Sequence, residues 1–278
     1  MTGTDLTQSH VVDQLIEERA VRLSANPWAW PLIKRVFYPL LGYQRARSIA
    51  DALVAKSGRE AMDWAQDFLS MSASVDGLDH VPETGPCVIT ANHPGGISDG
   101  IAVWQALKAR RPDMVFFANR DAIRVCEGLA DVVIPVEWRS GHRNREKTRD
   151  TLKRAITAFQ DGRCVVVFPA GRMSMWDWRT LSLRDESWQP TAVSLARKFK
   201  APIISLGVKQ RMSLWFYGLG LIHEELRHMT VFHELLAKKG AHYRLNFGAP
   251  QDPLALAGDE QVASETLRLC SQGLARTA

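Results

Sequence analysis

The sequence predicts an α/β domain with a mostly parallel central sheet flanked by helices and preceded by a helical extension. After residue 75, apolar runs of four to six residues alternate with segments of helical periodicity. Runs of this length suit strands that are buried on both faces, as in parallel sheets. Their alternation with helices is the pattern of a layered α/β domain. The expected strands are residues 87–91, 114–118, 132–136, 164–168 and 202–206.

Residues 1–74 are expected to form the N-terminal helical extension, and residues 75–278 the α/β domain. Apolar side chains recur in the first segment at roughly helical spacing, among them Ile49, Leu53, Trp64 and Phe68. Gly42 and Gly58 are the expected breaks between its helices.

Aromatic and basic residues are concentrated between residues 27 and 43. The segment contains Trp28, Trp30, Phe37, Tyr38 and Tyr43 around Lys34 and Arg35. Indole and phenol rings favour the headgroup level of a bilayer, from which basic side chains reach anionic phosphates. We therefore expect this extension to associate with a membrane. The alternative is an aromatic cluster packed on the protein itself.

Two helices are predicted next to the expected strands. One carries Leu152, Ala155, Ile156 and Phe159 at helical spacing and stops at Asp161-Gly162. The other follows the first strand, with Ser98 as its expected N-cap and with Ile101, Trp104 and Leu107 on one face. Catalytic residues of such a domain are expected in loops at the carboxyl ends of the strands.

The composition indicates a globular protein that is mildly basic. The net charge is +5, and the four cysteines form no C-x-x-C pair, which favours buried thiols in a reducing compartment. The start lacks a secretory signal, and the longest apolar stretch, residues 212–222, is shorter than the roughly 18 residues of a spanning helix. We expect a cytoplasmic protein that is peripheral on the inner face of the cell membrane.

The stretch NHPGGISDG, residues 92–100, follows the first expected strand and contains the strongest catalytic candidates. His93 is suited to accept a proton near neutral pH. Asp99 could bind its far ring nitrogen, fix the tautomer and stabilise the imidazolium that forms. Two glycines allow the loop to bring these residues together. A histidine and an aspartate six residues apart also arise by chance, so the pair alone is weak evidence.

The same stretch contains G-x-S-x-G, residues 96–100, the motif in which serine hydrolases hold their nucleophile. A serine esterase or lipase using Ser98 is therefore an alternative. It is disfavoured because four residues separate the strand from residue 96, and because His93 would have no role.

Further motifs follow in order: Arg120 and Arg124 just after the second strand, Phe168-Pro-Ala-Gly-Arg-Met-Ser174 after the fourth, and a strand that begins at Pro202. Together with Asn92-His93 and Asp99, they resemble the glycerolipid acyltransferase superfamily, which includes the lysophosphatidate acyltransferases. The resemblance covers roughly residues 75–250. Its motifs are Asn-His followed by Asp, an arginine, Phe-Pro-Glu-Gly-Thr-Arg-Ser and a proline-containing apolar strand.

Two departures from that family bear on the substrate. Five residues separate His93 from Asp99, where the family commonly has four, and this spacing resembles a bacterial subgroup. Ala170 replaces the glutamate of the third motif, and Arg172 is displaced by one position from its arginine. The family uses that glutamate and arginine to hold a glycerol phosphate, so a lyso-aminolipid acceptor becomes a candidate.

The resemblance implies a lysolipid O-acyltransferase in which His93 and Asp99 activate the acceptor hydroxyl. The acyl donor would be a thioester of an acyl carrier protein or coenzyme A, with no cofactor and no metal. The expected substrate-binding residues are Asn92, Arg120, Arg124, Gly171, Arg172 and Ser174. Amides around Gly171, or Arg120 or Arg172, are the expected oxyanion donors. A membrane-associated scaffold without catalysis is the remaining alternative.

Other functions are poorly supported by the sequence. The segment that begins at His233 lacks the second histidine of a zinc protease motif, and neither a Walker A sequence nor G-x-G-x-x-G is present. The basic run at residues 139–149 is expected to lead into the helix that contains Leu152 and to face lipid phosphates, an acidic carrier protein or solvent. We expect no nucleic-acid partner.

Overall fold

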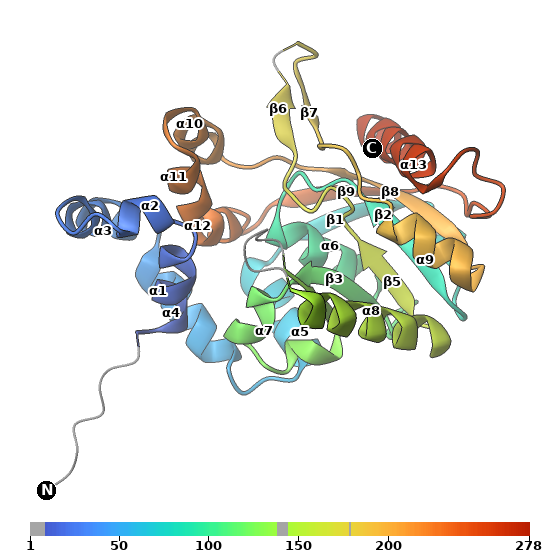
Figure 1. Ribbon diagram of the computed structural model, residues 1–278, viewed down its shortest axis with the longest axis horizontal. Helices are drawn as coiled ribbons and strands as arrows, with labels where there is room; N and C mark the ends of the chain where they lie inside the picture. The colour runs from blue at the N-terminus through green and yellow to red at the C-terminus, as the bar shows by residue number, and fades with distance from the viewer. Residues whose placement is uncertain (1–8, 138–143, 178) are drawn as a thin grey trace, which may run out of the picture.

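The computed structural model describes residues 9–137, 144–177 and 179–278, which fold around a seven-stranded sheet (Figure 1). Its spatial order is β1 (Ser72–Asp76), β9 (His242–Phe247), β8 (Ile203–Lys209), β2 (Cys87–Ala91), β5 (Cys164–Val167), β3 (Val115–Asn119) and β4 (Val133–Val136). All neighbouring strands are parallel except β8 and β9. The predicted fold class, a mostly parallel sheet flanked by helices, is confirmed.

The five strands expected from the sequence are β2, β3, β4, β5 and β8, each within a few residues of its expected bounds. The sequence analysis missed β1 and β9. In β9, exposed and buried residues alternate at its start, and β1 contains no fully buried residue, so neither forms a continuous apolar run. A two-stranded ribbon, β6 (Met175–Asp177) and β7 (Ser182–Arg184), projects from the sheet (Figure 1).

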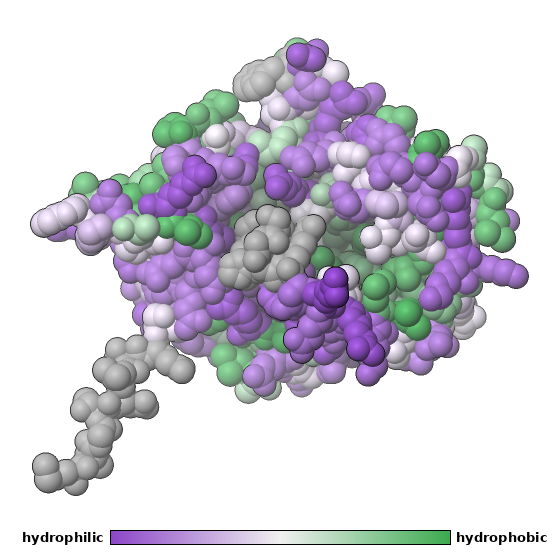
Figure 2. Space-filling view, viewed as in Figure 1, coloured by the Kyte–Doolittle hydropathy of each residue, from purple (hydrophilic) through white to green (hydrophobic). Residues whose placement is uncertain are grey.

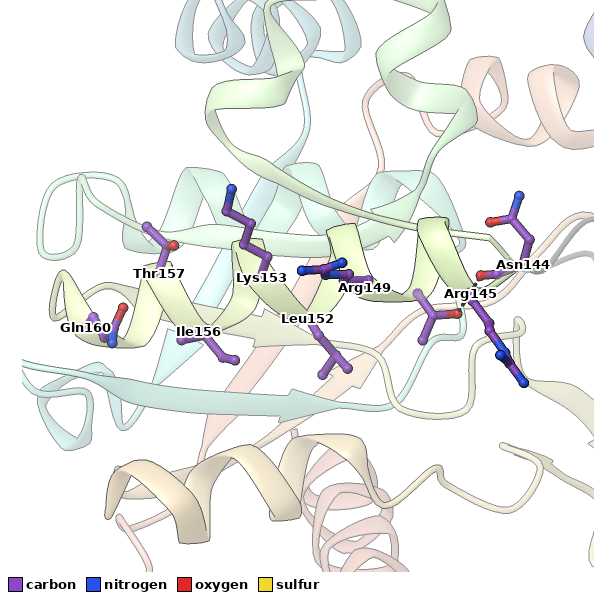
Figure 3. Close-up of a pocket in the computed structure, with 9 residues that line it drawn as sticks. Asn144, Arg145, Arg149, Leu152, Lys153, Ile156, Thr157 and Gln160 are labelled. Carbon is purple, nitrogen blue, oxygen red and sulfur yellow. Dashed lines mark hydrogen bonds between the residues drawn. The ribbon is translucent and has the colours of Figure 1, made fainter.

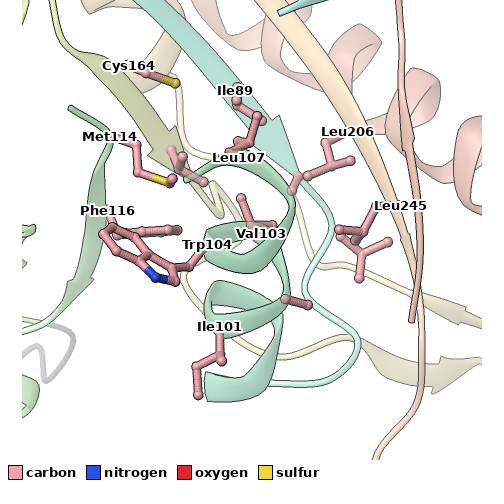
Figure 4. Packing of buried hydrophobic residues seen from close by; sticks show 14 of the residues in the cluster. Ile89, Ile101, Val103, Trp104, Leu107, Met114, Phe116, Cys164, Leu206 and Leu245 are labelled. Carbon is pink, nitrogen blue, oxygen red and sulfur yellow. The ribbon is translucent and has the colours of Figure 1, made fainter. Parts of the chain in front are cut away.

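Helices cover both faces of the sheet. One face packs against α5 (Gly58–Leu69) and α6 (Ile97–Leu107), and Trp104 of α6 is among the largest side chains of this core (Figure 4). The other face packs against α8 (Arg145–Gln160), α9 (Thr191–Phe199) and α13 (Glu260–Thr277). Cys87 and Cys164 lie side by side on β2 and β5 and are fully buried, as expected for small apolar side chains.

The predicted helix around Leu152 is α8, which ends at Gln160 beside Asp161-Gly162 as expected. The prediction that Ser98 caps the helix after β2 is wrong. The N-cap of α6 is Gly96, whose φ of +67° and ψ of −141° exclude a side chain, so the helix begins two residues earlier than a serine cap requires.

The N-terminal residues form helices, as predicted: α1 (Val11–Glu17), α2 (Val21–Ser24), α3 (Ala29–Leu40) and α4 (Tyr43–Leu53). They lie beside α10 (Leu214–Ile222), α11 (Glu224–Met229) and α12 (Val231–Leu236), and share one apolar cluster with Met229 (Figure 1). In contrast, α5 contributes to the core of the sheet. The domain boundary between residues 74 and 75 stays a prediction.

The aromatic residues between positions 27 and 43 divide into two groups. Trp30 is buried, and Tyr38 stacks on Tyr43 with 4.2 Å between ring centroids. These rings, with Phe37, pack inside the N-terminal cluster, as the alternative interpretation expected. Trp28 is 90% exposed and begins an exposed apolar stripe on α3 that continues through Leu32, Val36 and Leu40. None of the described helices is long and apolar enough to cross a membrane.

Candidate active site

His93, in the loop after β2, and Asp99, in the first turn of α6, form a hydrogen-bonded pair. His93 Nδ1 lies 2.9 Å from Asp99 Oδ2. The imidazole is 19% exposed, whereas Asp99 is completely buried. The second ring nitrogen, Nε2, makes no hydrogen bond to the residues that the structure describes. The pair therefore presents one imidazole nitrogen that is free to accept a proton.

Asp99 is held by its own loop as well as by the histidine. Its Oδ2 accepts a second hydrogen bond from the Gly95 amide, at 2.8 Å. The residue lies in the first turn of α6, where the amide dipoles favour a negative charge. Burial, followed by the charge of Asp99, raises the pKa of Tyr243 well above its ordinary value, so that phenol stays neutral beside the carboxylate.

The two glycines of the loop are each required by the geometry. A Cβ atom on Gly95 would lie 2.3 Å from Asp99 Oδ1 and 2.5 Å from the Tyr243 hydroxyl. A Cβ on Gly96 would lie 2.5 Å from Met212 Cε, and its positive φ disfavours any other residue. The turn that brings His93 and Asp99 together therefore depends on the absence of side chains here.

Ser98 is not placed to act as a nucleophile. It is completely buried on α6, where its hydroxyl donates to the Gly95 carbonyl at 2.8 Å. It also contacts the Tyr243 hydroxyl at 2.7 Å. A serine nucleophile needs its base within hydrogen-bond reach, but the described contacts of Ser98 do not include His93. The geometry therefore disfavours a serine hydrolase.

Asn92 extends the sheet rather than facing a cavity. Its amide nitrogen donates to the Val208 carbonyl at 2.9 Å, and its oxygen accepts from the Val208 amide at 2.7 Å. These two bonds join the end of β2 to β8 just before His93. The expected role of Asn92 in binding substrate stays a prediction, which this engagement does not favour.

The loop after β5 lies against the histidine. The rings of Phe168 and His93 are stacked, and the Ser174 amide donates to the His93 carbonyl at 2.9 Å. Gly171 has a φ of +65°, and its amide donates to the Phe168 carbonyl, so it is not a free oxyanion donor. Arg172 is largely exposed, with a loose 3.7 Å contact to Glu186.

Ser174 and a residue that the sequence analysis missed, Asp185, form a buried group beneath His93. The Ser174 hydroxyl donates a hydrogen bond to Asp185, and Trp188 Nε1 donates another at 2.9 Å. The His93 amide donates to the same carboxylate at 3.3 Å. Nothing in the local sequence around Asp185 marks it as part of a site, because the contact joins residues 92 positions apart.

Arg120 and Arg124 follow β3, two strands away from β2, which places them about 10 Å from the end of β2 along the sheet edge. Arg120 contacts Asp150 at 3.2 Å, and its buried Nε has no hydrogen-bond partner. Arg124 is bound by Glu18 through both guanidinium nitrogens, at 2.7 and 2.9 Å, which ties α7 (Asp121–Val125) to α1. Its expected role in binding substrate stays a prediction that this pairing does not favour.

A cavity of about 930 Å³ lies along the exposed side of α8 rather than around His93 and Asp99, which we call the dyad (Figure 3). Its lining combines basic, apolar and neutral polar side chains: Asn144, Arg145, Thr148, Arg149, Leu152, Lys153, Ile156, Thr157 and Gln160. Part of the predicted basic run, residues 139–143, lies outside the described residues, and the rest opens α8. Within the described ranges, no cluster of three or more His, Cys, Asp or Glu side chains could hold a metal ion.

Comparisons with known proteins relate this chain to acyltransferases. The acyltransferase family matches residues 72–209, which include the dyad and the loop after β5. A lyso-glycine lipid O-acyltransferase of Phocaeicola vulgatus is 25% identical over 201 residues, or 70% of each chain. The crystal structure of the 1-acyl-sn-glycerophosphate (LPA) acyltransferase PlsC from Thermotoga maritima has the same fold, with a TM-score of 0.50 and 15% identity over 94% of this chain and 97% of that one.

Proposed function

The chain belongs to the glycerolipid acyltransferase superfamily, and from this premise we propose that it transfers a fatty acyl group from a thioester to the hydroxyl of a lysolipid. The observation that carries the proposal is the pairing of His93 Nδ1 with buried Asp99, which leaves Nε2 free beyond the carboxyl end of β2. Such a pair fits general base catalysis without a protein nucleophile.

The proposed mechanism is direct transfer. His93 Nε2 removes the proton from the acceptor hydroxyl as its oxygen attacks the thioester carbonyl carbon. The tetrahedral intermediate then collapses, the carbon–sulfur bond breaks, and the imidazolium returns its proton to the leaving thiolate. Asp99 stabilises the imidazolium between these steps. General base catalysis of this kind contributes typically ~10²–10⁴-fold.

The developing oxyanion needs donors that face the thioester carbonyl. Because the Gly171 amide is already bound to Phe168, the remaining candidates in this loop are the neighbouring amides and the Arg172 guanidinium. Arg120 is the other candidate, because its Nε lacks a partner. Each of these groups could instead bind the head group of the acceptor.

The acceptor we favour is a lyso-aminolipid, whose head group is an amino acid. Ala170, buried in the loop after β5, replaces the glutamate with which the family holds a glycerol phosphate. The printed activity of the Phocaeicola vulgatus relative, on a lyso-glycine lipid, is of this class. The carboxylate of an amino-acid head group would suit an exposed arginine such as Arg172.

The donor we favour is an acyl carrier protein, with coenzyme A as the alternative. The cavity side of α8 combines the cations of Arg145, Arg149 and Lys153 with the apolar side chains of Leu152 and Ile156 (Figure 3). None of the three cations forms an ion pair with another described residue. An acidic protein with an apolar patch would complement this surface in charge and in polarity.

We also propose that the enzyme works at the inner face of the cell membrane as a peripheral protein. The stripe from Trp28 to Leu40 on α3 is exposed, and so are Leu214, Trp215, Leu221 and Ile222 on α10. Both helices lie on the same side of the molecule, where hydrophobic residues reach the surface (Figures 1 and 2). An apolar edge of this kind suits shallow insertion into a bilayer.

One assay tests the activity directly. Purified protein is supplied with an acyl thioester of carrier protein or coenzyme A, and with lyso-glycine lipid or lysophosphatidate as acceptor. Acylation of the aminolipid in preference to lysophosphatidate supports the full proposal. Acylation of lysophosphatidate alone would refute the aminolipid acceptor, and no transfer to any lysolipid would favour the scaffold.

A further inference from the structure

A second buried carboxylate, Asp185, lies beneath the catalytic pair. It follows β7 directly and is 6% exposed. Three donors converge on it: the Ser174 hydroxyl, Trp188 Nε1 and the His93 amide. Trp188 is completely buried, so the carboxylate is enclosed on that side by an indole that packs in the core between α8, α9 and the sheet.

These contacts hold the main chain of His93 from both sides. The His93 amide donates to Asp185 at 3.3 Å, and the His93 carbonyl accepts from the Ser174 amide at 2.9 Å. Ser174 and Asp185 are in turn hydrogen-bonded to each other. The three residues therefore form a closed ring of hydrogen bonds. The ring joins the segment after β2, which holds His93, to the loop after β5, which holds Ser174, and to the segment after β7, which holds Asp185.

A buried charge is costly unless it is paired and hydrogen-bonded. Burial raises the pKa of Asp185 despite hydrogen bonds that lower it, and the charge of His93 is also among the lowering causes. By reciprocity, an ionised Asp185 favours the protonated imidazole. The carboxylate thus influences both the position of His93 and the charge that the ring takes during transfer.

We propose that Asp185 is a positioning residue of the catalytic centre, which fixes the His93 backbone together with Ser174 and stabilises the imidazolium that forms in the reaction. This proposal rests on the proposed function, in which His93 is the base. Asp99 orients the ring from its Nδ1 side, and Asp185 anchors the peptide from which that ring projects.

The test compares Asp185→Asn, Asp185→Asn combined with Trp188→Phe, and Ser174→Ala. An asparagine that keeps its oxygen towards His93 turns its NH₂ group towards Trp188 Nε1, so the added Trp188→Phe removes a clash between donors. We expect kcat to fall about 10-fold or more in both Asp185 variants, with KM changed less than about twofold, because small displacements of a base cost up to ~10²-fold. Ser174→Ala should cause a smaller loss of kcat.

Two readouts separate positioning from general stability. The acidic limb of the kcat/KM profile should move to lower pH in Asp185→Asn, since a negative charge near the imidazole is lost. The NMR titration midpoint of the ¹³C-labelled His93 ring should move the same way in protein without substrate. Glu234→Gln is the matched control, because Glu234 is buried and also accepts from a serine hydroxyl and a backbone amide, those of Ser213. It should change neither readout.

A folded Asp185→Asn with wild-type kcat and an unshifted His93 titration would overturn the inference. If that variant does not fold, the kcat of Ser174→Ala decides, and a wild-type kcat there also overturns the inference. His93→Ala is measured in parallel. If it retains activity, the proposed mechanism fails, whereas the NMR titration still reports whether Asp185 acts on His93.

Discussion

The imidazole of His93 stacks on the ring of Phe168, with 4.3 Å between the ring centroids and 28° between the ring planes. His93 follows β2 and Phe168 follows β5, so the two rings come from the loops at the carboxyl ends of neighbouring parallel strands. With Nδ1 bound to Asp99, the stacking fixes the plane of the ring as well as its tautomer. The proposed base therefore has one orientation before any substrate arrives.

Loss of the dyad should abolish most of the transfer reaction. We expect His93→Ala to lower kcat by ~10²–10⁴-fold, since it removes the general base. Asp99→Asn should also lower kcat strongly, because an amide can favour the wrong tautomer of His93. Rates are measured by single-turnover acyl transfer. Ser98→Ala tests the serine hydrolase alternative, in which Ser98 is the nucleophile. If Ser98→Ala alone were inactive, the proposal that His93 acts directly on the acceptor hydroxyl would be wrong.

Gly95→Ala should impair catalysis more than folding. The new Cβ would lie 2.3 Å from Asp99 Oδ1 and force that carboxylate away from His93. We expect kcat to fall about 10²-fold, as for a displaced catalytic group. Gly273→Ala on α13 is the control, because a Cβ there would meet no atom within 4 Å and alanine favours a helix. Equal activity of both variants would argue against the requirement for glycine at 95.

Membrane binding should depend on the exposed stripe of α3. Trp28→Gln combined with Leu32→Gln replaces two exposed apolar side chains without touching the buried rings of Trp30 and Tyr38. We expect sedimentation with anionic liposomes to weaken about 10-fold or more, since a buried side chain contributes roughly 1.5–3 kcal/mol. Leu269→Gln, an exposed leucine on α13, is the control. Equal liposome binding by both variants would contradict the proposal that α3 contacts the membrane.

Charge reversal on α8 should affect one class of donor. We expect Arg149→Glu with Lys153→Glu to raise KM for acyl carrier protein about 10-fold or more, and the effect to diminish at high salt. KM for acyl coenzyme A should change much less if the surface recognises protein. Arg276→Glu, an exposed arginine in the last turn of α13, serves as the control. A comparable rise in KM for both donors would indicate that α8 binds a group they share.

Asp185 should make the stability of the protein depend on pH in a defined direction. Burial raises its folded pKa above the unfolded value of about 3.9, so its contribution to stability is full below that value and is lost as pH rises through the folded pKa. Asp185→Asn does not ionise. The stability of the variant relative to wild type should therefore increase as pH rises from about 4 towards neutral, as measured by urea unfolding. A constant difference across that range would contradict the pKa shift.

Patterns within short segments predicted most of the fold. Five strands of the main sheet and α8 were found because their apolar residues form short continuous runs or recur at regular helical spacing. The strands β1 and β9 were not predicted because their apolar residues do not form continuous runs. The N-cap of α6 was predicted wrongly because the sequence does not show the backbone conformation that Gly96 adopts.

The candidate site was predictable only where it is local. His93 and Asp99 are six residues apart in one loop, so their pairing could be inferred from the motif. Asp185 and Tyr243 reach the same loop from 92 and 145 positions away, through contacts that exist only after the sheet has formed. The sequence also could not distinguish Trp28, which is exposed, from Trp30, which is buried two residues later.

The shared cluster of α1–α4 with Met229 has a consequence for biosynthesis. The ribosome releases α2 and α4 early, but α11 and α12, which they contact, come from the last quarter of the chain. Until those helices emerge from the ribosome, the side of the N-terminal helices that is buried in the folded protein stays exposed to solvent. The proposed membrane-facing edge is then completed only near the end of translation, so premature insertion of the nascent chain would compete with its folding.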